Sequence, residues 1–249
     1  MKPIIHKLKP SNGFSYLLHL GLMLFLPIGT FILISINFIQ LAFSLIVLSK
    51  WRMFAVRPRF WAANIRANAV DLMIGISVVI FMDHATRVDI RLLWVVFYAV
   101  WLIYIKPASN MLLVAAQAFI GQLVSLMALY LLWPNGPLVA LTALTGIFCY
   151  LSARHFLEAF DETYAKLLSY IWGYFAATLA WLISHWLLFY RGVALTTLLL
   201  SCLGYGFSII YYLDHSNKLS KGLKRQFIFV MTAIVIVILV FSPWQAKVV

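Results

Sequence analysis

Residues 14–48 read FSYLLHLGLMLFLPIGTFILISINFIQLAFSLIVL, a run that contains no Asp, Glu, Lys or Arg. A transmembrane helix needs about 20 apolar residues, so this run is too long for one span and slightly short for two. Pro27 and Gly29 lie near its middle, and proline close to glycine is typical of a turn. We therefore expect two helices here, at 13–27 and 30–49.

The composition of the whole chain agrees with a membrane location. Of its 249 residues, 64% are hydrophobic and 10% are charged, whereas soluble domains usually have about 45–50% apolar and about 25% charged residues. A water-soluble fold of this size cannot bury so much apolar surface, which excludes a soluble enzyme, a disordered tail and a disulfide-rich scaffold. Cys149 and Cys202 lie within apolar runs, and we expect both to be small core residues.

Further apolar segments follow the first run, separated by charged stretches or by proline and glycine. We expect them to form helices at 69–83, 91–105, 110–133, 137–152, 166–189, 193–213 and 226–242. A strand-based barrel is excluded because these segments are apolar on all faces and do not alternate. The sequence therefore predicts an all-α bundle of about nine transmembrane helices that forms one domain over residues 1–249.

The distribution of charge predicts the orientation of this bundle. Nineteen Lys and Arg against seven Asp and Glu give a net charge of +12. With nine spans, most basic residues fall on the side that holds residues 1–12 and the loop 50–66, as expected for cytoplasmic loops. We therefore expect a cytoplasmic N-terminus and an external C-terminus. No loop is long enough to build an element that reads nucleic acid, so we expect no nucleic-acid partner.

Small and polar residues recur at helical spacing within two predicted spans. Gln117, Gly121 and Ser125 are four residues apart, as are Thr142 and Gly146. Small residues at this spacing let membrane helices approach closely, and a glutamine can hydrogen-bond across the contact. We expect helix packing here, with a pore lining as the alternative.

A first polar cluster opens the third predicted span. Asn64, Asn68 and Asp71 would share one helical face, with Arg66 beside them. Asp71 lies just inside the hydrocarbon boundary, where an acid needs a partner. Together with Lys106 in the next loop on the same side, these residues suit the phosphorylated head group of a lipid. The alternative for the basic loop is a role in orientation and in contact with anionic lipids.

A second polar cluster is the segment SARHFLEAFDE at 152–162. If it extends the sixth helix, His155, Glu158 and Glu162 share one face. Carboxylates at this spacing suit Mg²⁺, which takes one or two of them and completes its shell with water and substrate phosphate. The alternative is a solvated loop whose acids pair with nearby cations such as Arg154.

In this arrangement the chain resembles the UbiA-type polyprenyltransferase superfamily. The resemblance rests on the segment from Arg154 to Glu162, on Tyr104-Ile105-Lys106-Pro107 and on Arg57-Pro58. The family's other Asp-rich motif has no counterpart, because residues 49–57 contain no acid.

The resemblance implies nine helices and transfer from a prenyl diphosphate. Lys106 and Arg154 would be catalytic and grip phosphate, Asn64, Arg66, Asn68, Asp71 and His155 would bind substrate, and Mg²⁺ would be held by Glu158, Asp161 and Glu162. It also implies a membrane lipid or isoprenoid as substrate and a bacterial or archaeal cytoplasmic membrane as location. Two alternatives stay open, namely a non-catalytic lipid-binding subunit with a protein partner, and a small-solute transporter.

Overall fold

The computed structural model describes residues 13–184, 189–190 and 193–242, and the chain is almost entirely helical in these ranges. The helices are α1 (Gly13–Ser35), α2 (Ile39–Leu48), the 3-10 turns η1 (Trp51–Met53) and η2 (Pro58–Phe60), α3 (Trp61–Ala67), α4 (Ala69–His84), α5 (Val88–Val100), the π-turn η3 (Trp101–Ile105), α6 (Met111–Leu132), α7 (Leu138–Ala159), α8 (Ala165–Ser184), α9 (Leu195–His215) and α10 (Lys221–Val240). A short antiparallel pair, β1 (Phe189–Tyr190) and β2 (Val193–Ala194), connects α8 to α9.

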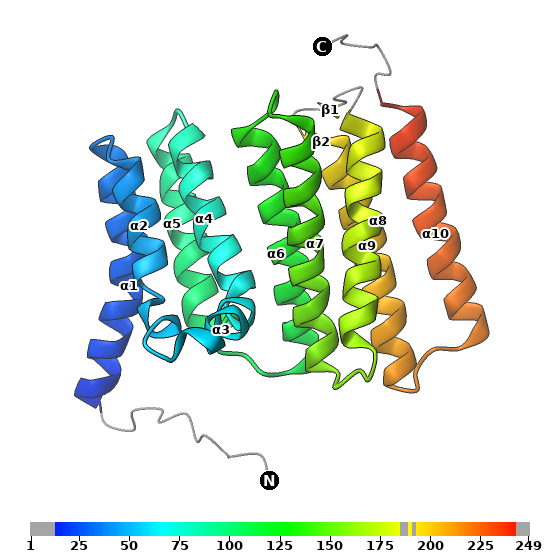
Figure 1. The fold of residues 1–249 in the computed structure, drawn as a ribbon, viewed down its shortest axis with the longest axis horizontal. Helices are drawn as coiled ribbons and strands as arrows, with labels where there is room; N and C mark the ends of the chain where they lie inside the picture. The colour runs from blue at the N-terminus through cyan, green and yellow to red at the C-terminus, as the bar shows by residue number, and fades with distance from the viewer. Residues whose placement is uncertain (1–12, 185–188, 191–192, 243–249) are drawn as a thin grey trace.

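The long helices stand side by side in a slab and run alternately up and down (Figure 1). Short connections favour antiparallel neighbours, which explains this alternation. In the view of Figure 1, α1 begins at the lower edge and α10 ends at the upper edge, while α3 and the α7–α8 connection lie at the lower edge. The residues at the two chain ends, 1–12 and 243–249, lie outside the described ranges, and which edge faces the cytoplasm stays a prediction.

The prediction of an all-α membrane bundle is confirmed at the level of helix length and composition. Within the described ranges, six helices are long and apolar enough to cross a membrane, or up to seven if α4 and the segment before it, bent by 66°, form one span. The first two predicted spans correspond to shorter apolar helices, Leu20–Ser35 and Ile39–Leu48. The exact number of nine spans therefore stays a prediction.

The predicted break within residues 14–48 is in the wrong place. α1 continues through Pro27 to Ser35, and the chain turns at Asn37, which has a φ of 62°. A proline is tolerated inside a membrane helix when nearby groups satisfy the backbone that it disturbs. The nearby hydroxyl of Thr30 is itself paired within the helix, because it donates to the carbonyl of Pro27 at 2.8 Å. Two helices form as expected, but an asparagine in the left-handed region ends the first of them.

The small residues act in helix packing, as predicted. A Cβ added to Gly121 would lie 2.7 Å from Val70, so this glycine lets α6 approach α4. Gly146 of α7 and Gly173 of α8 face each other, and a Cβ on either would lie within 3.1 Å of the other's carbonyl oxygen. Cys149, a free cysteine, is fully buried near this contact, as expected for a core residue. Backbone proximity of this kind stabilises helix pairs in a membrane, where lipid tails compete for apolar contacts.

Candidate functional site

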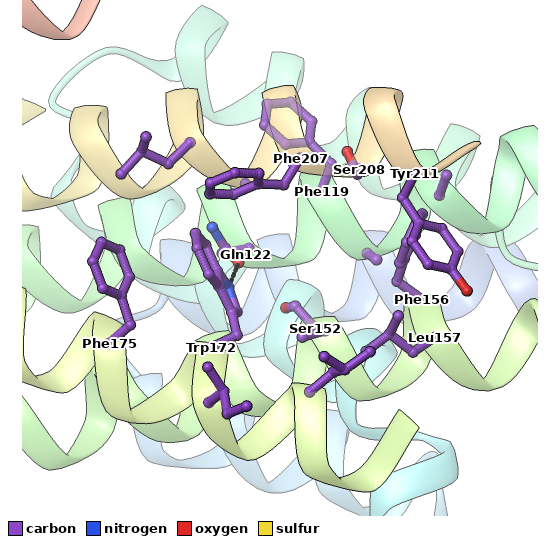
Figure 2. A pocket seen from close by; sticks show the side chains of 17 residues that line it. Phe119, Gln122, Ser152, Phe156, Leu157, Trp172, Phe175, Phe207, Ser208 and Tyr211 are labelled. Carbon is purple, nitrogen blue, oxygen red and sulfur yellow. Dashed lines mark hydrogen bonds between the residues drawn. The ribbon is translucent and has the colours of Figure 1, made fainter. Parts of the chain in front are cut away.

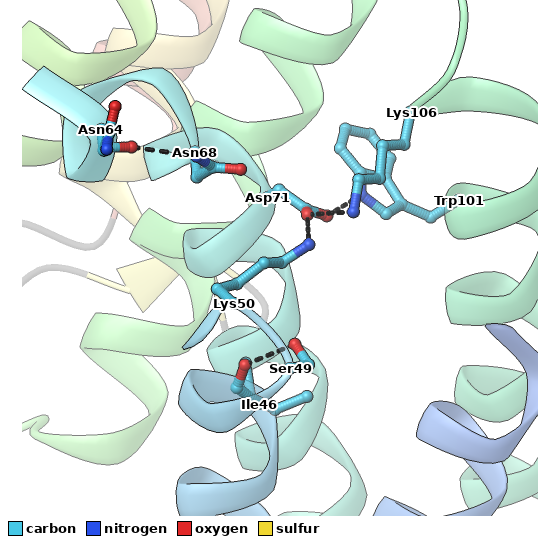
Figure 3. Close-up of polar contacts among 8 residues, drawn as sticks. All are labelled: Ile46, Ser49, Lys50, Asn64, Asn68, Asp71, Trp101 and Lys106. Carbon is cyan, nitrogen blue, oxygen red and sulfur yellow. Dashed lines mark hydrogen bonds and ion pairs between the residues drawn. The ribbon is translucent and has the colours of Figure 1, made fainter. Parts of the chain in front are cut away.

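Asp71, in the first turn of α4, is the centre of a buried polar cluster (Figure 3). Its Oδ2 atom accepts from Lys50, which follows α2, and lies 2.7 Å from Nζ of Lys106. Its Oδ1 atom accepts from the indole nitrogen of Trp101 at 2.9 Å. The side chain of Asp71 is only 10% exposed, so the carboxylate is removed from water with its oxygen atoms already occupied.

This cluster carries a net positive charge, because two ammonium groups share one carboxylate. Burial lowers the pKa of Lys50 from its ordinary value, against the opposing attraction of the Asp71 carboxylate, and the charge of Lys106 lowers it further. The unlike charges nevertheless lie within hydrogen-bond distance of each other. A buried acid with such partners is costly to disturb, because removal of the carboxylate leaves uncompensated ammonium groups.

The other predicted head-group residues do not share a helical face with Asp71. The helix is interrupted at Asn68, where α3 ends and α4 begins, so the expected spacing over Asn64, Asn68 and Asp71 is wrong. The Asn64 amide donates to the carbonyl of Met53 at 3.3 Å, and the Asn68 amide donates to the carbonyl of Asn64 at 2.9 Å. Arg66 is exposed. These amides therefore stabilise the α2–α4 connection.

A chain of hydrogen bonds links this region to the second polar segment. The Gln117 amide of α6 donates to the carbonyl of Ile105 at 2.6 Å and to that of Ala108 at 3.2 Å. Its oxygen atom lies 3.1 Å from Nε2 of His155 on α7. The two predicted polar segments thus lie at the same edge of the slab and are joined through Gln117.

The predicted helical face of His155, Glu158 and Glu162 is also wrong, because α7 ends at Ala159. Asp161, in the turn that follows, has a φ of 52°. Glu162 lies in the same connection and accepts a hydrogen bond from the hydroxyl of Tyr211 on α9. Glu158 stays on α7, where its Oε1 atom accepts from Nε of Arg154 at 2.5 Å. The acids are therefore held apart by different partners.

These positions do not fit a magnesium site. Among the residues that the structure describes, no group of three His, Cys, Asp or Glu side chains is placed to hold a metal ion. Glu158 is engaged by a guanidinium and Glu162 by a phenol, so two of the three predicted ligands have other partners. The expectation of Mg²⁺ stays a prediction.

A large apolar cavity lies between α6, α7, α8 and α9 (Figure 2). Its volume is about 540 Å³, within the range of pockets that hold small molecules. α8 packs closely along α7 but touches α9 only sparsely, which leaves room between α8 and α9. The lining residues are Ala115, Ala118, Phe119 and Gln122 of α6, Ser152, Ala153, Phe156 and Leu157 of α7, Leu168, Ile171, Trp172 and Phe175 of α8, and Leu203, Gly204, Phe207, Ser208 and Tyr211 of α9.

Gln122 fixes one part of the cavity wall by joining three helices. Its oxygen atom accepts from the indole nitrogen of Trp172 at 3.0 Å, and its nitrogen donates to the carbonyl of Leu200 at 3.0 Å. Gly204 permits this arrangement, because a Cβ there would lie 2.9 Å from the Gln122 nitrogen. Tyr211, which donates to Glu162, lines the cavity near the α7–α8 connection.

The predicted catalytic residues do not line this cavity. Arg154 and Glu158 are four residues apart on the side of α7 opposite Ser152, Ala153 and Phe156, which do line it. Lys106 belongs to the Asp71 cluster instead.

Three residues that the structure places in these sites, Lys50, Gln122 and Trp172, were not predicted from the sequence. The need of Asp71 for partners was an indication for Lys50, but only tertiary packing brings Gln122 against α8 and α9.

No protein-family model, curated protein or solved structure matches this chain.

Proposed function

We propose that this multi-pass membrane protein binds the hydrocarbon chain of a lipid in the cavity between α8 and α9. The observation that carries the proposal is the size and apolar lining of this cavity, which is formed mainly by aromatic and aliphatic side chains. Such a space is poorly suited to water, because bound water needs several polar partners. A hydrocarbon chain from the surrounding bilayer satisfies the same walls through packing.

The rim of the cavity supports entry from the membrane. Ile171 and Phe175 on α8 are 56% and 43% exposed, and Phe207 on α9 is 51% exposed. These side chains lie on the outer surface of the slab and also line the cavity. Lipid tails would therefore meet the cavity without crossing a polar barrier.

The aromatic walls favour an isoprenoid chain. Phe119, Phe156, Trp172 and Tyr211 offer flat faces to the methyl branches and double bonds of such a chain. An isoprenoid is also the lipid class that the family resemblance implies, and the role proposed for the cavity is binding.

Photolabelling in lipid nanodiscs tests this proposal. A photoreactive farnesyl lipid should label α8 and α9, and an Ala153→Phe substitution should reduce this labelling several-fold by filling the cavity. Ala140→Phe is the matched control, because Ala140 is also half-buried on α7 but does not line the cavity. Equal labelling of both variants and the parent protein would show that the cavity does not hold the lipid.

Transfer from a prenyl diphosphate is the second candidate function. Nη1 of Arg154 is buried and has no hydrogen-bond partner among the described residues, which favours an anionic ligand near it. The test is turnover of farnesyl diphosphate by the purified protein, with and without Mg²⁺. Full activity of a Glu158→Ala/Glu162→Ala variant would show that these acids do not form the transfer site. If the parent protein gives no turnover, lipid binding remains as the proposed function.

A further inference from the structure

Ser152 has a buried hydroxyl in the cavity wall that finds no hydrogen-bond partner in the part of the chain that the structure describes. The residue is 2% exposed and lines the cavity, where Figure 2 shows its hydroxyl among the other lining side chains. Within the described residues its Oγ atom finds neither a donor nor an acceptor. Buried hydroxyls are nearly always hydrogen-bonded, because an unpaired one loses the water that it had in the unfolded chain.

Most other serines in these helices hydrogen-bond to the backbone, whereas Ser201 of α9, which does not line the cavity, is also buried without a partner among the described residues. Each of the following donates to a carbonyl three or four residues earlier: Ser35, Ser44, Ser77, Ser125, Ser169, Ser208 and Ser242. This local bond is the usual solution for a helical hydroxyl in an apolar environment. Ser208 is the closest comparison, because it lines the same cavity and donates to the carbonyl of Tyr205 at 2.9 Å.

The remaining polar groups of the cavity are already engaged. Gln122 uses its oxygen atom for Trp172 and its nitrogen for Leu200, and the hydroxyl of Tyr211 donates to Glu162. Within the described ranges, no side chain that lines the cavity carries a charge. Among the residues that the structure describes, Ser152 is therefore the polar group of the cavity wall that can still hydrogen-bond to a ligand.

The position of Ser152 sets where the ligand's polar atom would lie. Ser152 is seven residues before the end of α7 at Ala159, which is about 10 Å along the helix axis. A charged group at this depth would lack a counter-charge in the cavity wall and would lose its hydration. A neutral oxygen, by contrast, needs only the one hydroxyl that the wall supplies.

We propose that the lipid held between α8 and α9 carries a neutral hydroxyl or carbonyl oxygen, which hydrogen-bonds to Oγ of Ser152 inside the cavity. This inference rests on the proposed function and narrows it to uncharged, oxygen-bearing lipids. The polar end of the ligand lies among the apolar side chains, and the phosphate-bearing form of the same chain is disfavoured.

The test compares three probes that share one carbon skeleton, namely farnesol, farnesyl phosphate and the hydrocarbon farnesene. Their affinities are measured on the full chain in nanodiscs, for the parent protein and for Ser152→Ala, Ser208→Ala and Ala153→Phe. One neutral hydrogen bond corresponds to an affinity change of about five-fold. We expect Ser152→Ala to lower the affinity for farnesol by about this factor and to leave the affinity for farnesene unchanged. Ser208→Ala should change the affinity for neither probe. Because Ser152 makes no internal hydrogen bond, the Ser152→Ala protein should unfold at the same temperature as the parent.

Two results would overturn the inference. The first is an unchanged farnesol affinity in Ser152→Ala, and the second is farnesyl phosphate binding as tightly as farnesol with the same dependence on Ser152. If either occurs while Ala153→Phe still weakens binding several-fold, the proposal of a lipid-binding cavity is retained and only the assignment of a neutral oxygen fails. If no probe binds the parent protein, the proposed function fails as well.

Discussion

Asp71 and Ser152 are both buried polar residues, one in each half of the slab, but the polar atoms of Asp71 are paired and the hydroxyl of Ser152 is not, among the described residues. Asp71 lies among α2, α4 and η3, where two lysines and an indole occupy its carboxylate. Beside it, Ile74 and Val78 of α4 are fully buried in a continuous apolar core. Ser152 lies among α6–α9, beside a cavity and with its hydroxyl unpaired. The comparison indicates a closed half that stabilises the bundle and an open half that has room for a ligand.

The largest expected effect comes from Asp71, in the closed half. Asp71→Asn would remove the counter-charge of the buried Lys50 and of the partly exposed Lys106, and breaking a buried ion pair such as Lys50–Asp71 typically costs about 3–5 kcal/mol. The free energy of unfolding in detergent measures this loss. Asp89→Asn is the control, because the Arg87–Asp89 pair is exposed and should contribute no more than about 1 kcal/mol. Similar losses in the two variants would show that the Asp71 cluster does not stabilise the closed half.

An intermediate effect is expected at Gly204, in the open half. In Gly204→Ala the new Cβ would lie 2.9 Å from the Gln122 nitrogen and 3.3 Å from the Trp172 ring. Overpacking of this kind usually costs about 1–3 kcal/mol, and here it would also push Gln122 out of its bridging position. Thermal unfolding and farnesol affinity should both decrease.

Gly222→Ala provides the comparison for Gly204. Gly222 lies in α10, and a Cβ there meets nothing within 4 Å, so this change should be neutral or slightly stabilising. If Gly204→Ala behaved like Gly222→Ala, the Gln122 bridge would not define the cavity wall.

The smallest expected effect concerns Glu162, at the mouth of the open half. The hydrogen bond from Tyr211 lowers the pKa of Glu162 below its ordinary value. A carboxyl with a lowered folded-state pKa contributes stability above its unfolded-state pKa and loses it as pH falls through the folded value. The unfolding temperature should therefore decrease slightly more between neutral pH and acidic pH in the parent than in Tyr211→Phe. Parallel pH curves for the two proteins would contradict this coupling.

The sequence was sufficient to predict the helical membrane bundle, because backbone groups in lipid must be satisfied within each segment. The predicted span at 69–83 corresponds closely to α4. The predicted shared faces failed at Asn68 and beyond Ala159, because in both places the helix ends within the proposed spacing. Helical spacing predicts a common face only while the helix continues.

The candidate site was only partly predictable for a related reason. Because an acid at the membrane boundary needs a partner, the sequence predicted that Asp71 and Lys106 lie in one cluster, and the structure confirms this proximity. Lys50 joins them because α2 packs against α4, and this packing is not encoded in local spacing. The cavity depends on the separation of α8 from α9, which no motif specifies.

The π-turn between α5 and α6 has a consequence for how the chain can vary in length. The backbone nitrogen of Lys106 donates to the carbonyl of Trp101 at 2.8 Å, five residues earlier. In a regular α-helix, residues five apart differ in direction by about 140°, so their side chains would diverge. The wider turn lets Trp101 and Lys106 reach the same carboxylate. Deleting one residue from this turn would leave Trp101 and the lysine four residues apart, which is about 40° apart in direction on a regular α-helix. The turn therefore accommodates one extra residue while both side chains still reach the Asp71 carboxylate.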